Sequence, residues 1–270
     1  MKNYKNLFLF TAVAMVAGSF LLSCNSSTKS EKKSTEDKAC CEEQPCAANT
    51  LSDKEKEQGF VLLFDGETSA GWRGYGKDHF PEAWTIEDGA LKCNGSGRGE
   101  AGAVDGGDII YEKQFSNFHL KLEWKISEGG NSGIFYLGQE SPEYDFIWKT
   151  APEMQVLDNE RHPDANLGKD GNRQAGSLYD LIPAVPQNAK PAGEWNSVEI
   201  ICYKGTVVHK QNGENVLEYH LWTPEWDELV ANSKFPGLNP NWAKVASTGF
   251  IGLQDHGDDV WFRSIKIKEL

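Results

Sequence analysis

The sequence is poor in positive charge. Lys and Arg number 27 among 270 residues, against 40 Asp and Glu, so the formal net charge is −13 at pH 7. Nucleic-acid binders hold phosphate through clustered Lys and Arg, and anionic lipid surfaces attract the same residues. The composition therefore argues against a nucleic-acid partner and against a domain that rides on anionic lipid through its own charge.

The sequence also lacks the short motifs of several common enzyme classes. It contains no zinc-protease, P-loop, dinucleotide-binding or nucleophile-elbow pattern. The aromatic share of 11% is too high for a disordered chain. Nine Trp with 27 Gly and 11 Pro indicate a turn-rich β protein whose rings suit carbohydrate.

One long apolar run is present, and it lies near the start of the chain. Residues 7–22 are predominantly apolar and follow a short basic segment, as in a secretory signal. They lead into Leu21-Leu22-Ser23-Cys24, which resembles a bacterial lipobox. We therefore expect residues 1–23 to be a lipoprotein signal peptide and Cys24 to carry the lipid; the alternative is an ordinary cleaved signal.

The segment after Cys24 is polar, and residues 24–56 are expected to form a flexible tether. Asn25 rather than Asp follows Cys24, which resembles an outer-membrane destination, so we expect a cell-envelope lipoprotein facing the periplasm. The cysteines of the tether are expected to form disulfides or stay free rather than bind metal; they are Cys40, Cys41 and Cys46. Cys93 and Cys202 lie in apolar runs and are expected in the core.

From Gly59 onward the dominant pattern has period two. Residues 119–126 alternate strictly, and 83–94 and 196–220 show strands separated by turn residues. The pattern predicts about ten strands and shows no strand–helix–strand alternation, which indicates antiparallel pairing. Residues 57–270 are therefore expected to form one all-β domain, a two-sheet β-sandwich or jelly roll. Residues 223–235 predict a short inserted helix.

Polar side chains occupy positions where a buried strand should be apolar. Glu153 and Gln155 fall on the same face of a predicted strand, where they would form an acid/base or sugar-binding pair, or a solvated edge. His256 follows the apolar strand 250–253 directly, beside Asp255. Histidine titrates near neutral pH and suits proton transfer, although a single histidine is also common as a structural residue.

Further candidates lie at strand ends and in two long polar loops, residues 142–152 and 159–174. Loops of this length in a compact domain are usually functional. The candidates for binding substrate are Asn131, Ser132, Trp148, Arg161 and Tyr179. The group around Arg161 would hold substrate or a cation such as Ca²⁺, or would be a surface salt-bridge patch.

Several ordered motifs resemble those of the 3-keto-disaccharide hydrolase domain family. They are Gly59–Gly66 with Gly71-Trp72, Asn131–Ile134, Glu153–Val156, Gly176–Tyr179, Gly193–Asn196 and Gly252–Gly257. The resemblance covers about residues 57–270. It implies a concanavalin A-like sandwich and activity on glycosides oxidised to a 3-ketone. It also implies a partner oxidoreductase that makes the ketone.

The chemistry implied by this resemblance is proton abstraction at C2, elimination of the group at C1, and addition of water. It requires a base, an acid and a group that holds the enolate oxygen. We expect His256 and Glu153 to be base and acid in an order that the sequence leaves open, with Asp255 orienting His256. A divalent cation at the C3 oxygen is a further expectation, with unknown ligands. The alternatives are a non-catalytic lectin and a structural surface domain.

Overall fold

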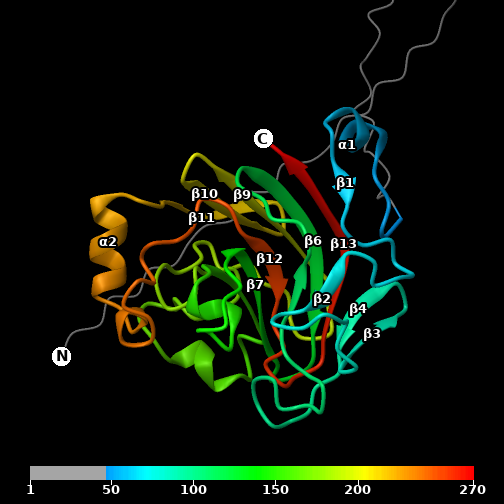
Figure 1. Cartoon of the computed structure of the whole chain (residues 1–270), viewed down its shortest axis with the longest axis horizontal. Coiled ribbons are helices and arrows are strands. Elements are labelled where there is room, and N and C mark those ends of the chain that lie inside the picture. Colours follow the sequence, from blue (N-terminus) through cyan, green and yellow to red (C-terminus); the bar gives the residue numbers. More distant parts are fainter. Residues whose placement is uncertain (1–46) are drawn as a thin grey trace, which may run out of the picture. The chain divides into compact units, whose positions relative to one another are not determined.

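The computed structural model describes residues 47–270, which form one compact unit (Figure 1). The predicted signal peptide, the predicted lipidation site Cys24, and Cys40, Cys41 and Cys46 lie outside the described residues. Cys93 and Cys202 are free thiols with 0% and 1% of their surface exposed, so their prediction as core residues is confirmed.

The larger of two antiparallel sheets contains eight strands. They are β1 (Val61–Leu62), β3 (Trp84–Glu87), β4 (Ala90–Cys93), β6 (Phe118–Ile126), β9 (Asn196–Tyr203), β10 (Thr206–Gln211), β11 (Glu214–His220) and β13 (Val260–Glu269). Their order is β11-β10-β9-β6-β13-β4-β3, and β1 pairs with β13. Buried and half-exposed residues alternate strictly along β6, so one face of this sheet packs inward and the other meets solvent.

The smaller sheet has the order β2-β5-β12-β7-β8. Its strands are β2 (Trp72–Gly74), β5 (Ile109–Tyr111), β7 (Asn131–Gly138), β8 (Glu153–Leu157) and β12 (Phe250–Leu253). Every residue of β7, β8 and β12 is buried, so both faces of these strands are covered.

The two faces of the smaller sheet pack against different groups. Met154 and Val156 join the large apolar core between the sheets, as do Ile134 and Tyr136 on β7. Phe135 points the other way, into a separate apolar cluster on the outer face. That cluster includes residues of the loop after β7, where the short 3-10 helix η1 (Ile147–Lys149) lies. Side chains that share the face of Phe135 therefore point away from the main core, into the covered outer side of the smaller sheet.

The inserted helix is present but shorter than predicted. Helix α2 (Pro224–Ala231) has Thr223 as its N-cap and is followed by the 3-10 helix η3 (Phe235–Gly237). A stack of rings fixes the insertion to the sandwich. The ring of Tyr219 on β11 lies 5.4 Å from that of Trp226, which lies 5.8 Å from Trp242, and the Trp242 ring lies 4.0 Å from that of Phe235. In Figure 1, α2 (orange) lies at one side of the domain.

The folded unit begins earlier than the predicted boundary at residue 57. Helix α1 (Asp53–Glu57) starts with a capping box on Ser52. Asn49 donates a hydrogen bond to the Gly89 carbonyl oxygen (2.8 Å), and Lys266 pairs with Glu55 at 2.8 Å. Residues 47–56 are therefore packed on the sandwich, although their polar composition predicted a tether. No helix within residues 47–270 is long and apolar enough to cross a membrane.

The predicted sandwich is confirmed, with additions that the sequence did not indicate. The predicted strands at 83–94, 119–126, 153–157, 196–220 and 260–267 are all present. Strands β2 and β5 were not predicted, because three residues are too few to show a period. The 3-10 helix η2 (Pro163–Asn166) also lies inside a predicted loop.

Candidate active site

A cavity of about 150 Å³ lies against the outer face of the smaller sheet. It is lined by Glu100, Asn131, Trp148, Glu153, Gln155, Tyr179, Lys234, Phe235, Leu238, Gln254 and His256. Six of these were predicted as site residues from sequence: Asn131, Trp148, Glu153, Gln155, Tyr179 and His256. The structure therefore brings together residues that lie more than 100 positions apart in the chain.

Strand register places the polar floor of this cavity. Gly133 pairs with Gln155, and Phe135 pairs with Glu153, so these residues share the outer face of the sheet. Gly133 leaves room for the carboxyl group, because a Cβ atom at this position would lie 2.1 Å from Glu153 Oε1. Glu153 is only 8% exposed, and burial raises the pKa of its carboxyl well above the usual range. The floor thus holds a carboxyl group that favours its protonated form.

Two amides connect Glu153 with His256. In the orientation that satisfies its neighbours, the Gln155 amide donates to Glu153 Oε1 (3.1 Å) and to the Ser132 carbonyl oxygen (3.0 Å). Its oxygen then lies 3.2 Å from Asn131 Oδ1, so the Asn131 amide must turn as well in order to donate to it. The Asn131 atom 3.4 Å from His256 Nε2 is then the amide oxygen, which accepts from the imidazole N–H. The chain His256–Asn131–Gln155–Glu153 runs along the cavity floor and fixes the relative positions of imidazole and carboxyl.

His256 is held as a neutral imidazole. Burial is the main reason that its pKa is lowered, and nearby Asp258 offsets this only in part. Its ring also contacts the His162 ring edge-on, with centroids 6.2 Å apart. A neutral imidazole in a cavity can accept a proton.

The predicted pairing of Asp255 with His256 is wrong. The Asp255 carboxylate points away from the cavity and accepts hydrogen bonds from the backbone N–H groups of Gly107 (2.7 Å) and Gly257 (3.0 Å). Strand alternation explains this, because neighbouring residues at the end of β12 point to opposite sides. Asp255 therefore positions backbone and does not orient the imidazole.

The ammonium group of Lys234 lines another side of the cavity. Lys234 Nζ lies 3.3 Å from the Tyr179 hydroxyl and 4.3 Å from the centre of its ring. The Tyr179 hydroxyl donates to Asp164 Oδ2 at 2.9 Å, and Arg173 pairs with the same carboxylate. Burial lowers the pKa of Lys234, which nearby Asp180 opposes. The insertion that contains α2 and η3 thus contributes a cation that no sequence pattern marked.

Glu100 is a second carboxyl in the cavity and was not predicted. It lies on the glycine-rich loop between β4 and β5, where no period marks its position. Its Oε1 accepts a hydrogen bond from Trp148 Nε1 at 2.5 Å. Burial raises the pKa of Glu100, while the bond from Trp148 works in the opposite direction. The only sequence signal for it was the density of glycine around it.

The loop that carries Glu100 is fixed at both ends. Ala101 N donates to the Asp255 carbonyl oxygen (3.1 Å), and Gly97 N donates to the Gly257 carbonyl oxygen (2.9 Å). Gly257 permits this close approach, since a Cβ there would lie 2.5 Å from the Gly99 carbonyl oxygen. The loop is thereby packed on the segment that carries His256.

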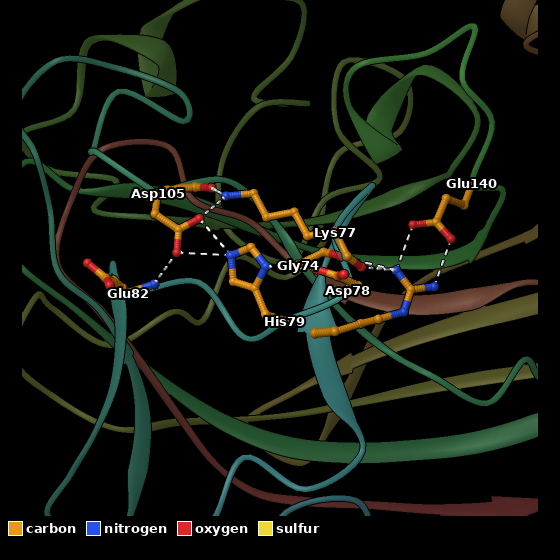
Figure 2. A network of polar contacts seen from close by, with 9 residues as sticks. Gly74, Lys77, Asp78, His79, Glu82, Asp105 and Glu140 are labelled. Carbon is orange, nitrogen blue, oxygen red and sulfur yellow. Dashed lines mark hydrogen bonds and ion pairs between the residues drawn. The ribbon is translucent and has the colours of Figure 1, made fainter.

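The far end of the same loop is held by Asp105. Figure 2 shows its carboxylate between Lys77 and His79. Lys77 Nζ donates to it at 2.5 Å, His79 Nε2 lies 3.0 Å away, and the backbone N–H of Glu82 donates at 2.9 Å. These contacts connect the loop to the segment after β2.

Besides Asp255, two more predicted residues do not line the cavity. The Ser132 hydroxyl is fully buried and donates to the Gln254 carbonyl oxygen at 2.8 Å, which is a structural role. Arg161 is an exposed residue whose partners are Glu128, Asp158 and Glu160, as in the surface salt-bridge alternative. Among residues 47–270, no group of three or more His, Cys, Asp or Glu is arranged to hold a metal ion. The side chains described thus offer no ready set of ligands for the expected cation.

Known proteins resemble this chain in sequence and in structure. A family model described as the 3-keto-alpha-glucoside-1,2-lyase-like domain matches residues 59–268. A 3-keto-disaccharide hydrolase from Bacteroides thetaiotaomicron is 51% identical over 289 aligned positions, covering 98% of this chain and 99% of that protein.

Two crystal structures from Parabacteroides distasonis show the same fold. Both proteins are provisionally described as glycosyl hydrolases. The first superposes with a TM-score of 0.72 at 30% identity, covering 83% of this chain and all of that one. The second gives a TM-score of 0.58 at 28% identity, with 78% and 99% covered. The likeness therefore extends over essentially the whole sandwich.

Proposed function

Because the chain belongs to the 3-keto-alpha-glucoside-1,2-lyase-like domain family, we propose that it cleaves glycosides whose sugar carries a ketone at C3. The family and the high identity to a 3-keto-disaccharide hydrolase make the protein a glycoside hydrolase. The proposed route is removal of the C2 proton, elimination of the group at C1, and addition of water.

The ketone dictates what the cavity must supply. It makes the C2 hydrogen acidic, and the bond from C1 to the leaving oxygen lies β to the carbanion that forms. A base must take the C2 proton, an acid must protonate the leaving oxygen, and a positive group must stabilise the enolate oxygen at C3. Two carboxylates flanking the glycosidic bond, as in ordinary glycosidases, are not required for this route.

Protonation states assign the two central roles. His256 is the base, since its lowered pKa leaves the imidazole neutral at pH 7. Glu153 is the acid, since burial keeps its carboxyl protonated. This pair carries the proposal: an unprotonated imidazole and a protonated carboxyl, fixed by two amides on one cavity floor. When the environments of two groups shift their pKa values in opposite directions, one group can act as acid and the other as base at the same pH.

Lys234 and Tyr179 are the groups that suit the enolate oxygen. An ammonium group and a hydroxyl lie 3.3 Å apart at the cavity wall. In a partly enclosed cavity, such fixed positive charge and donors stabilise developing negative charge more strongly than they would in water. Trp148, Phe235 and Leu238 give the apolar surface against which a sugar ring packs.

Three further parts of the proposal concern the surroundings of the protein. Cys24 is its lipid anchor, and the domain faces the periplasm at the outer membrane. An oxidoreductase that oxidises the C3 hydroxyl of a glycoside must supply the substrate.

The lectin alternative does not explain the perturbed pKa values of Glu153 and His256, since sugar binding needs no titrating pair.

The test is the release of aglycone from a 3-keto-glucoside and from its unoxidised parent, with and without a chelator. The purified protein is expected to act on the ketone alone, and deuterium at C2 of the substrate should slow release. E153Q and H256Q should each lose about 10²–10⁴-fold in kcat/KM. E160Q removes an exposed carboxyl outside the cavity and is the matched control. Equal cleavage of both substrates, or release that is insensitive to C2 deuterium, would refute the elimination route.

A further inference from the structure

A network of three polar side chains lies in the apolar core between the two sheets. It consists of His209 on β10, Tyr136 on β7 and Tyr219 on β11, with 0%, 0% and 5% of their surfaces exposed. The Tyr136 hydroxyl lies 2.8 Å from His209 Nε2 and 2.7 Å from the Tyr219 hydroxyl. His209 Nδ1 lies 3.0 Å from the Gly176 carbonyl oxygen. None of the three side chains of this core network lines the cavity, and the proposed reaction uses none of them directly.

The Gly176 carbonyl determines the direction of every hydrogen bond in the core network. A carbonyl oxygen only accepts, so His209 Nδ1 carries a hydrogen and donates it. Burial lowers the pKa of His209 to about 4, so the ring is neutral and Nε2 accepts from the Tyr136 hydroxyl. The Tyr136 oxygen then accepts from the Tyr219 hydroxyl. Each hydrogen has one acceptor, and the network ends on the backbone of Gly176.

The segment that starts at Gly176 runs beside β8, the strand that carries the proposed acid. Gly176 N donates to the Gln155 carbonyl oxygen (2.8 Å), and Gln155 N donates to the Ser177 carbonyl oxygen (3.0 Å). Tyr179 N donates to the Glu153 carbonyl oxygen at 3.0 Å. The backbone that carries Tyr179 into the cavity is therefore held by β8 on one side and by the core network on the other.

The Gly176 carbonyl depends on a side chain for its donor. Gly176 has a φ of +85°, so the backbone departs from regular strand geometry at this point. Among residues 47–270, His209 is the only donor to this carbonyl oxygen. A buried carbonyl without a donor is costly. Apolar side chains of similar shape could fill the core as well as the network does, but they could not donate to Gly176.

Building on the proposed function, we infer that His209 is a positioning residue that sets the place of Tyr179 at the cavity wall through its hydrogen bond to Gly176. Without the donor, the Gly176 carbonyl is left unsatisfied and the segment moves. Tyr179 is three residues further along, and its hydroxyl lies 3.3 Å from Lys234 Nζ. The movement therefore displaces a group that the reaction needs at the enolate oxygen. A displacement of about 1 Å can cost about 10²-fold in rate.

Two substitutions of His209 separate the donor from the bulk of the ring. Asparagine places an amide N–H at the position of Nδ1, whereas glutamine places one at the position of Nε2. Acting on a 3-keto-glucoside, H209N should keep kcat within about threefold of wild type, whereas H209Q should lose about 10²-fold with a smaller change in KM. H209M, which has no donor, should lose as much as H209Q and gives a second comparison with H209N.

The matched control is Y219F. It removes a buried hydroxyl from the core network but leaves the bond from His209 to Gly176 intact. Its ring can still stack on Trp226, which lies 5.4 Å away, so the insertion keeps its place. Y219F should lower Tm and leave kcat within about threefold of wild type, because the donor to Gly176 remains.

Two further measurements distinguish positioning from a loss of core stability. If His209 acts through Tyr179, their effects are coupled, so H209Q should cost less than about threefold in kcat when Y179F is already present. Amide hydrogen exchange needs no turnover. The N–H groups of Gly176 and Tyr179, which bond to β8, should exchange faster in H209Q than in Y219F.

The outcomes separate this inference from the proposed function. No release of aglycone by wild type from the 3-keto-glucoside would refute the proposed function, and amide exchange would still decide whether His209 holds the segment. Equal exchange at Gly176 and Tyr179 in H209Q and Y219F would overturn the positioning role. Equal kcat in H209Q and H209N would also overturn it. So would a loss of kcat in Y219F as large as in H209Q, because the effect would then follow the stability of the core.

Discussion

Replacing Glu153 with Gln should make the fold more stable relative to wild type as pH rises. The glutamine oxygen can still accept the hydrogen bond from Gln155, so the change chiefly removes an ionisable proton. In the unfolded chain a glutamate loses its proton near its ordinary pKa of 4.5, whereas buried Glu153 keeps it. Unfolding of wild type therefore releases a proton above pH 4.5, and a release of protons on unfolding lowers stability as pH increases.

The magnitude follows from linkage for a single group. The free energy of unfolding of wild type should fall, relative to E153Q, by up to about 1.4 kcal/mol per pH unit. The fall begins near pH 4.5 and continues to the raised pKa of Glu153. For a domain of this size about 1 kcal/mol corresponds to about 2–4 °C in Tm, so the gap should widen by about 3–6 °C per pH unit. Glu100 and Asp108 also have raised pKa values but are present in both proteins.

Thermal unfolding of both proteins from pH 4 to pH 8, at constant ionic strength, is the assay. The difference in Tm between E153Q and wild type should be smallest at pH 4 and should widen above it. Parallel curves across the whole range would show that Glu153 ionises in the folded protein as it does in the unfolded chain. Its role as the protonated acid would then be refuted, whatever the loss of activity in E153Q.

Two other substitutions test how the site is positioned. In G133A the new methyl group would lie 2.1 Å from Glu153 Oε1. The value of kcat/KM should therefore fall by about 10²-fold, and the fold should lose about 1–3 kcal/mol of stability. G237A is the control and should change neither quantity, because a Cβ atom at Gly237 would have no neighbour within 4 Å. Unchanged kinetics in G133A would show that catalysis does not depend on the present position of the Glu153 carboxyl. D255N weakens the hydrogen bonds that the backbone N–H groups of Gly107 and Gly257 donate to this side chain. The free energy of unfolding should therefore fall by about 1.5–3 kcal/mol, seen as a lower Tm, while the pH–rate profile keeps its shape. A shifted profile in D255N would instead restore the role in orienting His256.

The sequence predicted the sandwich because period two is a strong signal in long strands. Strand β6 alternates over nine residues, and the hairpin turns at Lys204-Gly205 and Asn212-Gly213 are present as predicted. Glu153 and Gln155 were found because polar residues inside a buried strand break the expected pattern. The same reasoning missed β2 and β5, whose three residues contain no complete period.

Site residues on irregular segments were the hardest to predict. Glu100 and Lys234 enter the cavity through backbone contacts between segments that are distant in sequence. The Glu100 loop, for example, is fixed to the residues after β12. Asp255 was assigned to the wrong partner because adjacency in sequence at a strand end says nothing about which way a side chain points. Only the three-dimensional packing decides such cases.

The division between strand residues and loop residues has a consequence for the chemistry. His256, Asn131, Gln155 and Glu153 lie on or directly after strands of one sheet, so their spacing is set by register and tolerates little change. Glu100 lies on a loop held by backbone hydrogen bonds, which many loop sequences could provide. In the proposed function the strand residues perform the elimination. Substitutions within the loop that keep its backbone hydrogen bonds should therefore leave the relative positions of the base and the acid unchanged.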